Sequence, residues 1–204
     1  VNVFNGEKYL EESLVSLINQ NYKNTTIHCF DNHSTDKTQE IIKEYANSYS
    51  NLISYSTPRH IPLVVARNYA LSILKKNMSE PFYFGYCDAD DLWDKNWVSS
   101  LMAFGDQNYD LLVCNYYSLE GNQQTRISSC LSQTRPSPFN CPVGILSCLF
   151  SSRLIEIEST LFNNDFPISW DTEFWIRRGL DLSYIHISDH LCYYRIHSNS
   201  LVQS

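Results

Sequence analysis

The chain has 204 residues, of which 43% are hydrophobic and 18% charged, and its formal net charge is −7. This length suits one domain, and the composition is that of a globular protein. The acidic charge argues against a protein that binds nucleic acid, because such proteins normally present a basic face. It permits a nucleotide ligand, since a metal ion can supply positive charge locally.

The seven cysteines include no CxxC pair, so neither a zinc site nor a dense disulfide framework is expected. We therefore expect a reducing, cytoplasmic (intracellular) setting. No apolar run approaches the ~20 residues of a membrane helix, and no signal peptide is recognisable, so no membrane span is expected. The opening residues 1–4 already read as a strand, which suggests that the chain is part of a longer multidomain protein.

Strands and helices are predicted to alternate along the first half of the chain. Strands are expected at residues 1–4, 25–30, 51–56, 81–87 and 109–117, and helices at 7–20, 34–49, 61–77 and 94–105. Such alternation with short connections predicts an α/β domain whose central sheet is mostly parallel and flanked by helices.

The second half is less regular. A polar, proline-containing segment at 118–142 predicts a hairpin or mobile loop. A helix at 171–180 and two strands at 182–187 and 191–197 follow. We expect one domain, 1–204, with a nucleotide-binding half (1–116) and a second half (117–204).

Three carboxylates, Asp88, Asp90 and Asp91, directly follow the predicted strand 81–87. Ligands of open α/β sheets lie beyond the carboxyl ends of the strands, where Asp31 also falls. Asp88 and Asp90 are two residues apart and point the same way in extended geometry, which suits Mg²⁺ or Mn²⁺ with water and phosphate oxygens as further ligands. The alternative is that Asp90, Asp91 or Asp94 caps the next helix, which explains one carboxylate but not three.

Other motifs are absent or incomplete. The sequence contains no P-loop, no GxGxxG and no GxSxG, and a calcium loop starting at Asp88 would need glycine and glutamate where Trp93 and Ser99 stand. His197 follows an apolar strand near the end of the chain; taken alone, such a histidine is more often structural than a ligand.

Five segments in order resemble the inverting family-two glycosyltransferases of the GT-A fold. They are FNGEKYLEESLVSLINQNYKNTTIHCFDNHSTDKTQEII at 4–42, ARNYAL at 66–71, CDADDLW at 87–93, WDTEFWIRR at 170–178 and YYRIHSNS at 193–200. The resemblance implies transfer of a sugar from a nucleoside-diphosphate donor, with UDP-sugar favoured, to a hydroxyl of a glycan or other acceptor. It also implies Mn²⁺ or Mg²⁺ as cofactor.

The resemblance assigns roles by position. Asp31 would hold the nucleotide base, with Val3, Phe4 and Asn5 beside it. The nucleotide or diphosphate would lie near Arg67 and Asp88. Asp88 and Asp90 would form the metal motif, with Asp90 the direct ligand and His197 a further candidate ligand. Asp171 would be the general base, and the less regular half at 117–204 would lie on the acceptor side.

The chemistry of the residues agrees with these roles, because a departing diphosphate needs charge stabilisation and an acceptor hydroxyl needs a carboxylate to take its proton. The alternative for Asp171 is a helix N-cap. The chain departs from the family pattern at Asn2, at Asn32-His33 and at Trp170, where glutamate is often found.

Two other functions remain open. A sugar nucleotidyltransferase would normally open with a glycine-rich loop carrying Arg or Lys, and this opening offers only Gly6. A non-catalytic nucleotide-sugar-binding module of the same fold is the second alternative.

Overall fold

The computed structural model describes residues 1–204 except 79–80, 130–142, 158–159, 180, 199 and 201–204. The helices are α1 (Leu10–Ile18), α2 (Thr38–Ser48), α3 (Leu63–Asn77), α4 (Trp97–Met102), α5 (Arg153–Ile157) and α6 (Trp170–Arg178). The strands are β1 (Asn2–Val3), β2 (Ile27–Asp31), β3 (Leu52–Ser56), β4 (Tyr83–Gly85), β5 (Leu92–Trp93), β6 (Leu111–Glu120), β7 (Gln123–Ile127), β8 (Cys148–Ser151) and β9 (Tyr184–Ile196).

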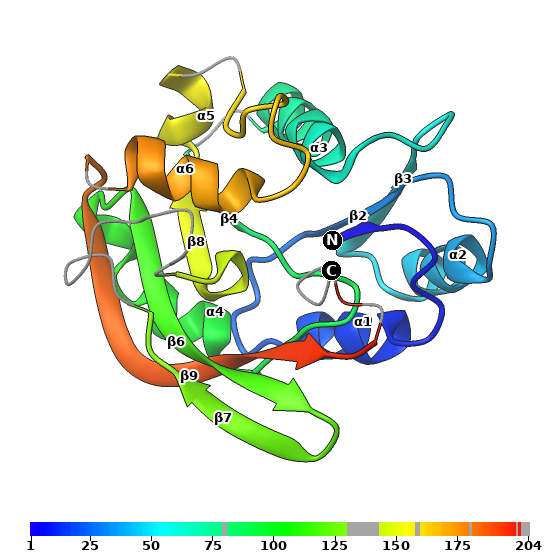
Figure 1. The fold of residues 1–204 in the computed structure, drawn as a ribbon, viewed down its shortest axis with the longest axis horizontal. Helices are drawn as coiled ribbons and strands as arrows, with labels where there is room; N and C mark the ends of the chain where they lie inside the picture. Colours follow the sequence, from blue (N-terminus) through cyan, green and yellow to red (C-terminus); the bar gives the residue numbers. More distant parts are fainter. Residues whose placement is uncertain (79–80, 130–142, 158–159, 180, 199, 201–204) are drawn as a thin grey trace.

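The strands form two sheets within the described residues. The first is parallel, in the order β1-β2-β3, and the second has the order β4-β8-β6-β9-β5, with β7 added to β6. In Figure 1 the first sheet and α2 occupy the right side, and the long β6, β7 and β9 strands curve along the left and bottom. The predicted α/β class is confirmed.

The fourth and fifth predicted strands do not extend the parallel sheet. Both β4 and β6 pair antiparallel with β8, so they run in the same direction but are separated by a third strand. The β8 segment is a short apolar run, and periodicity alone does not distinguish such a run from a buried piece of helix. No pattern in the sequence therefore indicates that this strand inserts between the other two.

The predicted hairpin is present as β6 and β7, which meet at Gly121 with a positive φ of 56°. Residues 130–142 of the predicted loop lie outside the described residues. The two strands predicted at 182–187 and 191–197 are one continuous strand, β9. Its pairing with β6 shifts register around Asn115, whose amide donates to the Ser188 carbonyl at 2.8 Å, so the irregular middle is held by a side chain.

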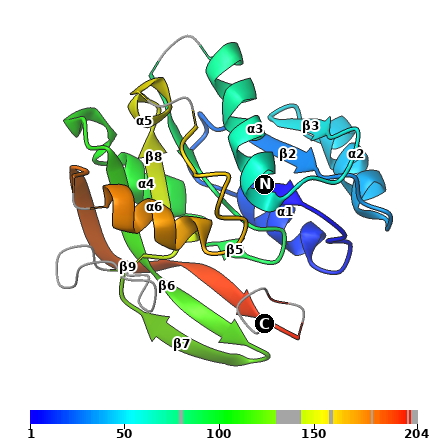
Figure 2. The ribbon, with the colours of Figure 1, turned by 45° about the horizontal axis from the view of Figure 1, so that its top comes forward.

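Apolar side chains form separate clusters on the two sheets. Leu10, Leu14 and Leu17 of α1 pack on the parallel sheet, whereas Phe84 and Phe150 pack with the aromatic residues of α6. Figure 2 shows α3 and α6 on the same side of the molecule. In the described part of the chain, no helix has both the length and the apolar character that crossing a membrane requires.

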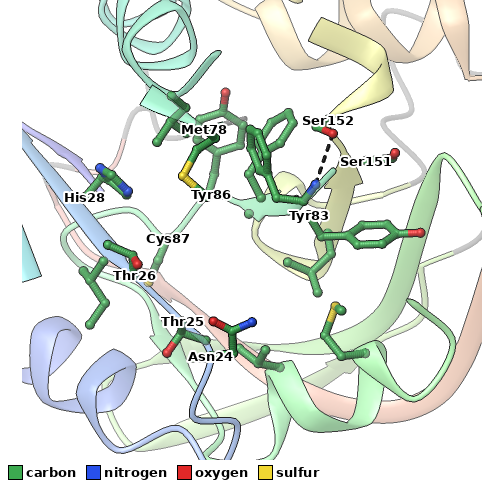
Figure 3. Close-up of a pocket in the computed structure, with 18 of the residues that line it drawn as sticks. Asn24, Thr25, Thr26, His28, Met78, Tyr83, Tyr86, Cys87, Ser151 and Ser152 are labelled. Atoms are coloured by element: carbon green, nitrogen blue, oxygen red, sulfur yellow. Dashed lines mark hydrogen bonds between the residues drawn. The ribbon is translucent and has the colours of Figure 1, made fainter. Parts of the chain in front are cut away.

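A cavity of about 770 Å³ lies between the start of β2, the end of α3 and β4 (Figure 3). His28, Met78 and Tyr86 are among its lining residues, whereas none of the predicted catalytic or metal-binding carboxylates lines it. The candidate site therefore lies elsewhere, at the carboxyl ends of β2 and β4.

Candidate functional site

The acidic motif (residues 88–91) contains carboxylates in different environments. The side chains of Asp88 and Asp90 are 36% and 31% exposed, whereas Asp91 is buried. Burial, followed by the charges of Asp88 and Asp90, raises the pKa of Asp91 well above its usual value. The Asp91 carboxyl also accepts the backbone N–H of Arg195 at 3.0 Å. Two carboxylates thus face solvent, and the third is stabilised in its neutral form.

Helix capping does not account for this motif. The next helix, α4, begins at Trp97, and Asp94 accepts the backbone N–H of Asn96 at 2.8 Å. Neither Asp90 nor Asp91 precedes a helix directly, so only Asp94 has the local turn contact that the capping alternative required.

The end of β9 and the residues after it contact the acidic motif. The imidazole Nε2 of His197 lies 2.9 Å from the Asp90 carboxylate, and its ring lies 4.9 Å from that of Tyr9. Arg195 donates from Nε to the Asp90 carbonyl at 2.9 Å and forms an ion pair with Glu12. His197 is therefore next to a predicted metal ligand. Arg195 lies within the segment 193–200 that resembles the family, but the resemblance implies no role for it.

Arg67 of α3 is fully buried and forms an ion pair with Asp88 at 2.5 Å. The centre of its guanidinium lies 4.2 Å from the Trp170 ring and 4.9 Å from the Tyr86 ring. The next residue, Asn68, exchanges hydrogen bonds with the backbone of Phe162, before α6. The Ala-Arg-Asn segment thus contacts both the acidic motif and the approach to α6.

The predicted nucleotide-binding residues lie together at the ends of β1 and β2. Val3 is opposite Asp31 in the parallel pairing, and the buried Asp31 carboxylate accepts the N–H of Ser34 at 3.1 Å. Phe4 is 47% exposed and its ring lies 4.2 Å from that of His60.

Asn5 and Gly6, in the loop after β1, lie against the loop after β2 and the acidic motif. The Asn5 side chain accepts the Thr35 N–H at 2.8 Å, which ties the loop after β1 to the loop after β2. A Cβ added to Gly6 would lie 2.6 Å from Val3 Cγ2 and 3.2 Å from Ala89 Cβ. Gly6 therefore lets the loop after β1 approach the acidic motif closely.

Asp171 is the second residue of α6, because the helix begins at Trp170, one residue earlier than predicted. Ser169 occupies the N-cap position, and Asp171 Oδ1 accepts the N–H of Thr172 at 2.8 Å. Asp171 is therefore not the N-cap residue, although it satisfies one N–H of the first turn. Trp170 beside it contacts Arg67, which brings the start of α6 close to Asp88.

The donor groups present fit a hard divalent cation with an incomplete protein shell. Among the described residues, no three His, Cys, Asp or Glu side chains close around one point. Two partly exposed carboxylates, Asp88 and Asp90, lie two residues apart at the end of β4. Mg²⁺ is commonly held by one or two carboxylates together with substrate phosphates and water, so an open site of this kind suits it.

Comparison with curated proteins shows several glycosyltransferases. An uncharacterized glycosyltransferase of Haemophilus influenzae is 22% identical over 96% of this chain and 64% of its own length. Glycosyltransferase GlyA of Streptococcus pneumoniae is 33% identical over 60% of this chain and 17% of its own length. The dTDP-rhamnosyl transferase RfbG of Shigella flexneri is 26% identical, and the match covers 79% of this chain and 57% of RfbG. The chain thus spans less than two thirds of each of these relatives.

Solved structures with the same fold include S. aureus TarS in complex with UDP-GlcNAc. Its TM-score is 0.78 at 22% identity, over 100% of this chain and 59% of that chain. The mannosyltransferase PcManGT from Pyrobaculum calidifontis, in complex with GDP-Man and Mn²⁺, has a TM-score of 0.70 at 17% identity, over 98% of this chain and 56% of its own. A family model described as Glycosyl transferase family 2 matches residues 1–180. This chain therefore belongs to glycosyl transferase family 2 and has the GT-A fold.

Proposed function

We propose that this domain transfers a sugar from a nucleoside-diphosphate donor to an acceptor hydroxyl, with inversion and with help from Mn²⁺ or Mg²⁺. The observation that carries the proposal is the pair of partly exposed carboxylates at the end of β4, in a chain of this family. A cation held there would stabilise the charge that develops on the departing diphosphate. We assign this cation to Asp88 and Asp90, with His197 as a further candidate ligand.

The donor nucleotide is assigned to the ends of β1 and β2. A carboxylate accepts an N–H donor, and uracil offers one on its imide edge, so Asp31 is proposed to hold the base. The exposed ring of Phe4, with backbone at Val3 and Asn5, would lie beside it. A UDP-sugar is the first donor to test, since TarS was solved with UDP-GlcNAc. GDP-sugars and dTDP-sugars are the next donors to test, since PcManGT was solved in complex with GDP-Man and RfbG is named a dTDP-rhamnosyl transferase.

Asp171 is proposed as the general base. Its carboxylate lies in the first turn of α6, beside Trp170 and therefore near the Arg67–Asp88 ion pair. A base in this position would take the proton of an acceptor hydroxyl as that oxygen attacks the sugar carbon. The acceptor, a glycan or another hydroxyl compound, would approach from the side of α6.

The test is a panel of UDP-, dTDP- and GDP-sugars, each assayed with Mn²⁺ or with EDTA for nucleotide release and calorimetric binding. We expect metal-dependent binding and turnover of one donor class, lost in Asp90→Ala and kept in Asp106→Ala, an exposed carboxylate outside the motif. Full turnover in EDTA would contradict the metal assignment. Release of pyrophosphate from a nucleoside triphosphate and a sugar phosphate would instead indicate a nucleotidyltransferase, and binding without turnover a non-catalytic module.

A further inference from the structure

We propose that Arg67 and Trp170 form a positioning pair that holds Asp88 of the acidic motif in register with the start of α6. The proposal rests on the proposed function, because Asp88 and Asp171 are the groups being positioned. In this arrangement Arg67 is not itself a ligand of the diphosphate, since its side chain presents about 1% of its surface to solvent. It acts on the donor through the carboxylate it contacts.

The environment of the Arg67 charge is the first line of support. Arg67 has five N–H donors, and only Nη2 reaches a carboxylate. Its Nε and Nη1 are buried and have no hydrogen-bond partner among the described residues. A buried cation with few hydrogen bonds is costly unless other groups compensate it. The faces of Trp170 and Tyr86 do so, and tryptophan gives the strongest cation–π attraction.

The second line of support is the way in which Arg67 and Trp170 connect two parts of the proposed site. Trp170 is the first residue of α6 and directly precedes Asp171. Its ring contacts the Arg67 guanidinium at 4.2 Å, and Arg67 contacts Oδ1 of Asp88. The Arg67 guanidinium thus links Trp170, which directly precedes the proposed base, to Asp88, a proposed metal ligand. The pair explains why tryptophan stands at this position: its uncharged face accepts the cation, which leaves the negative charge of Asp88 as the partner of Arg67.

The experiment separates positioning from simple packing. Trp170→Leu removes the cation–π acceptor, and Trp170→Phe keeps a weaker one. The matched control is Phe162→Leu, because Phe162 is fully buried and packs on Trp170 with a ring distance of 4.7 Å. Both leucine variants lose an aromatic ring from one cluster, but only Trp170→Leu removes a ring face from Arg67.

We expect Trp170→Leu to weaken UDP binding in the presence of Mn²⁺ by about tenfold or more, the scale of a desolvated cation–π contact. Trp170→Phe should lose less, and Phe162→Leu should stay within about twofold at a similar loss of melting temperature. Equal binding losses in the two leucine variants would overturn the proposal, because packing alone would then explain them.

A double-mutant cycle adds an independent check. If Trp170 acts through Arg67, then Trp170→Leu should have little further effect on UDP binding in an Arg67→Met background, whereas additive losses would contradict the coupling. Should Arg67→Met fail to fold, the comparison of the leucine variants decides. The NMR signal of the Arg67 Nε–H needs no ligand: a ring-current shift lost in Trp170→Leu but kept in Phe162→Leu supports the pair. This NMR result would support the pair even if the parent chain bound no nucleotide. Absence of nucleotide binding would refute the proposed function but not the contact between Arg67 and Trp170.

Discussion

The three carboxylates of the acidic motif avoid mutual repulsion because they occupy different surroundings. Asp88 faces the Arg67 guanidinium, Asp90 lies beside the His197 imidazole, and Asp91 is buried against the backbone N–H of Arg195. A like charge nearby and burial both favour the neutral form of a carboxyl group. The motif therefore places two carboxylates at the surface and favours the neutral form of the third.

The first prediction follows from the raised pKa of Asp91, which burial causes first and the charges of Asp88 and Asp90 second. A carboxyl group whose folded-state pKa exceeds its unfolded value contributes stability that is present below about pH 4 and is lost as the pH rises through the folded-state pKa. Asparagine does not titrate. The melting temperature of Asp91→Asn relative to the parent should therefore increase as the pH is raised from about 4 to 8.

Asp90→Asn is the control, because the Asp90 charge raises the pKa of Asp91 less than burial does. It should change metal-dependent nucleotide binding much more than it changes the pH dependence of stability. If Asp91→Asn lowered the melting temperature equally at every pH, Asp91 would be ionised and paired in the folded protein, contrary to its burial.

The second prediction concerns Asp171, which the proposed function makes the general base. Asp171→Asn keeps the shape and the hydrogen bond to Thr172, but the amide cannot accept a proton. Transfer should fall by about 10²–10⁴-fold, the usual contribution of general acid–base catalysis, while nucleotide binding and stability stay near those of the parent. Initial rates and calorimetry measure the two effects separately.

Glu173 provides the matched control for that experiment. It forms an ion pair with Arg177 one turn along α6. Glu173→Gln should retain most of the transfer rate and lose at most about 0.5 kcal/mol of stability, the scale of such helix pairs. The reverse result, with transfer lost in Glu173→Gln and kept in Asp171→Asn, would move the base to Glu173.

At the scale of elements, the end of β9 fixes the acidic motif from the side of the second sheet. Arg195 donates to the Asp90 carbonyl, pairs with Glu12 of α1, and has its guanidinium 4.6 Å from the centre of the Tyr9 ring. These contacts need a planar group with several N–H donors in fixed directions, which lysine lacks. One side chain therefore connects β9, α1 and the residues after β4.

The third prediction is that Arg195→Lys weakens Mn²⁺-dependent UDP binding by several-fold while costing about 1 kcal/mol of stability or less. The charge remains, but the paired contacts to the Asp90 carbonyl and Glu12 are not both kept. Arg153→Lys is the control, since Arg153 also pairs with a carboxylate, Asp110, away from the motif. Equal binding in both variants would show that Arg195 does not fix the acidic motif.

The elements that the sequence predicted well are those with clear periodicity. The helices α1 to α3 and the strands β2 and β3 lie within or close to their expected ranges. The continuous β9 was not foreseen, because the polar residues at 188–190 read as a turn, and the shift in register around Asn115 is a tertiary feature. In the candidate site, the short spacing between Asp88 and Asp90 was enough to predict a metal-binding role for them. No local pattern could indicate that Arg67 meets Trp170, since only folding brings α3 and α6 together.

At the scale of the whole molecule, the two sheets share no strand pairing among the described residues, and the cavity of about 770 Å³ lies between parts of them. Contacts other than strand pairing therefore join the two sheets. Several of them involve α1, which packs on the parallel sheet, and the residues just after it. Ser16 accepts the N–H of Trp93, and Asn21 donates its N–H to the Lys95 carbonyl at 2.8 Å.

Gln20, just beyond the end of α1, makes the most extensive of these connections. It is 4% exposed, and its amide donates to the Asp94 carbonyl at 2.8 Å and accepts the N–H of Val98 at 3.0 Å. The N–H of Val98 belongs to the first turn of α4, where the helix itself offers no acceptor. Gln20 thus satisfies one end of α4 while holding it against α1.

The last prediction is that Gln20→Leu lowers the free energy of unfolding by about 1–3 kcal/mol, because leucine leaves the buried N–H of Val98 without its partner, whereas the Asp94 carbonyl keeps the N–H of Trp97. Asn21→Ala is the matched control: it removes a single exposed hydrogen bond to Asn96 and should cost about 1 kcal/mol or less.

Urea denaturation followed by far-UV circular dichroism and by tryptophan fluorescence measures both variants. Coincident transitions would show that the two sheets still unfold together; separate transitions in Gln20→Leu would show that this side chain couples them. An unfolding free energy equal to that of Asn21→Ala, with coincident transitions, would mean that water replaces the lost partners and that other contacts join the sheets.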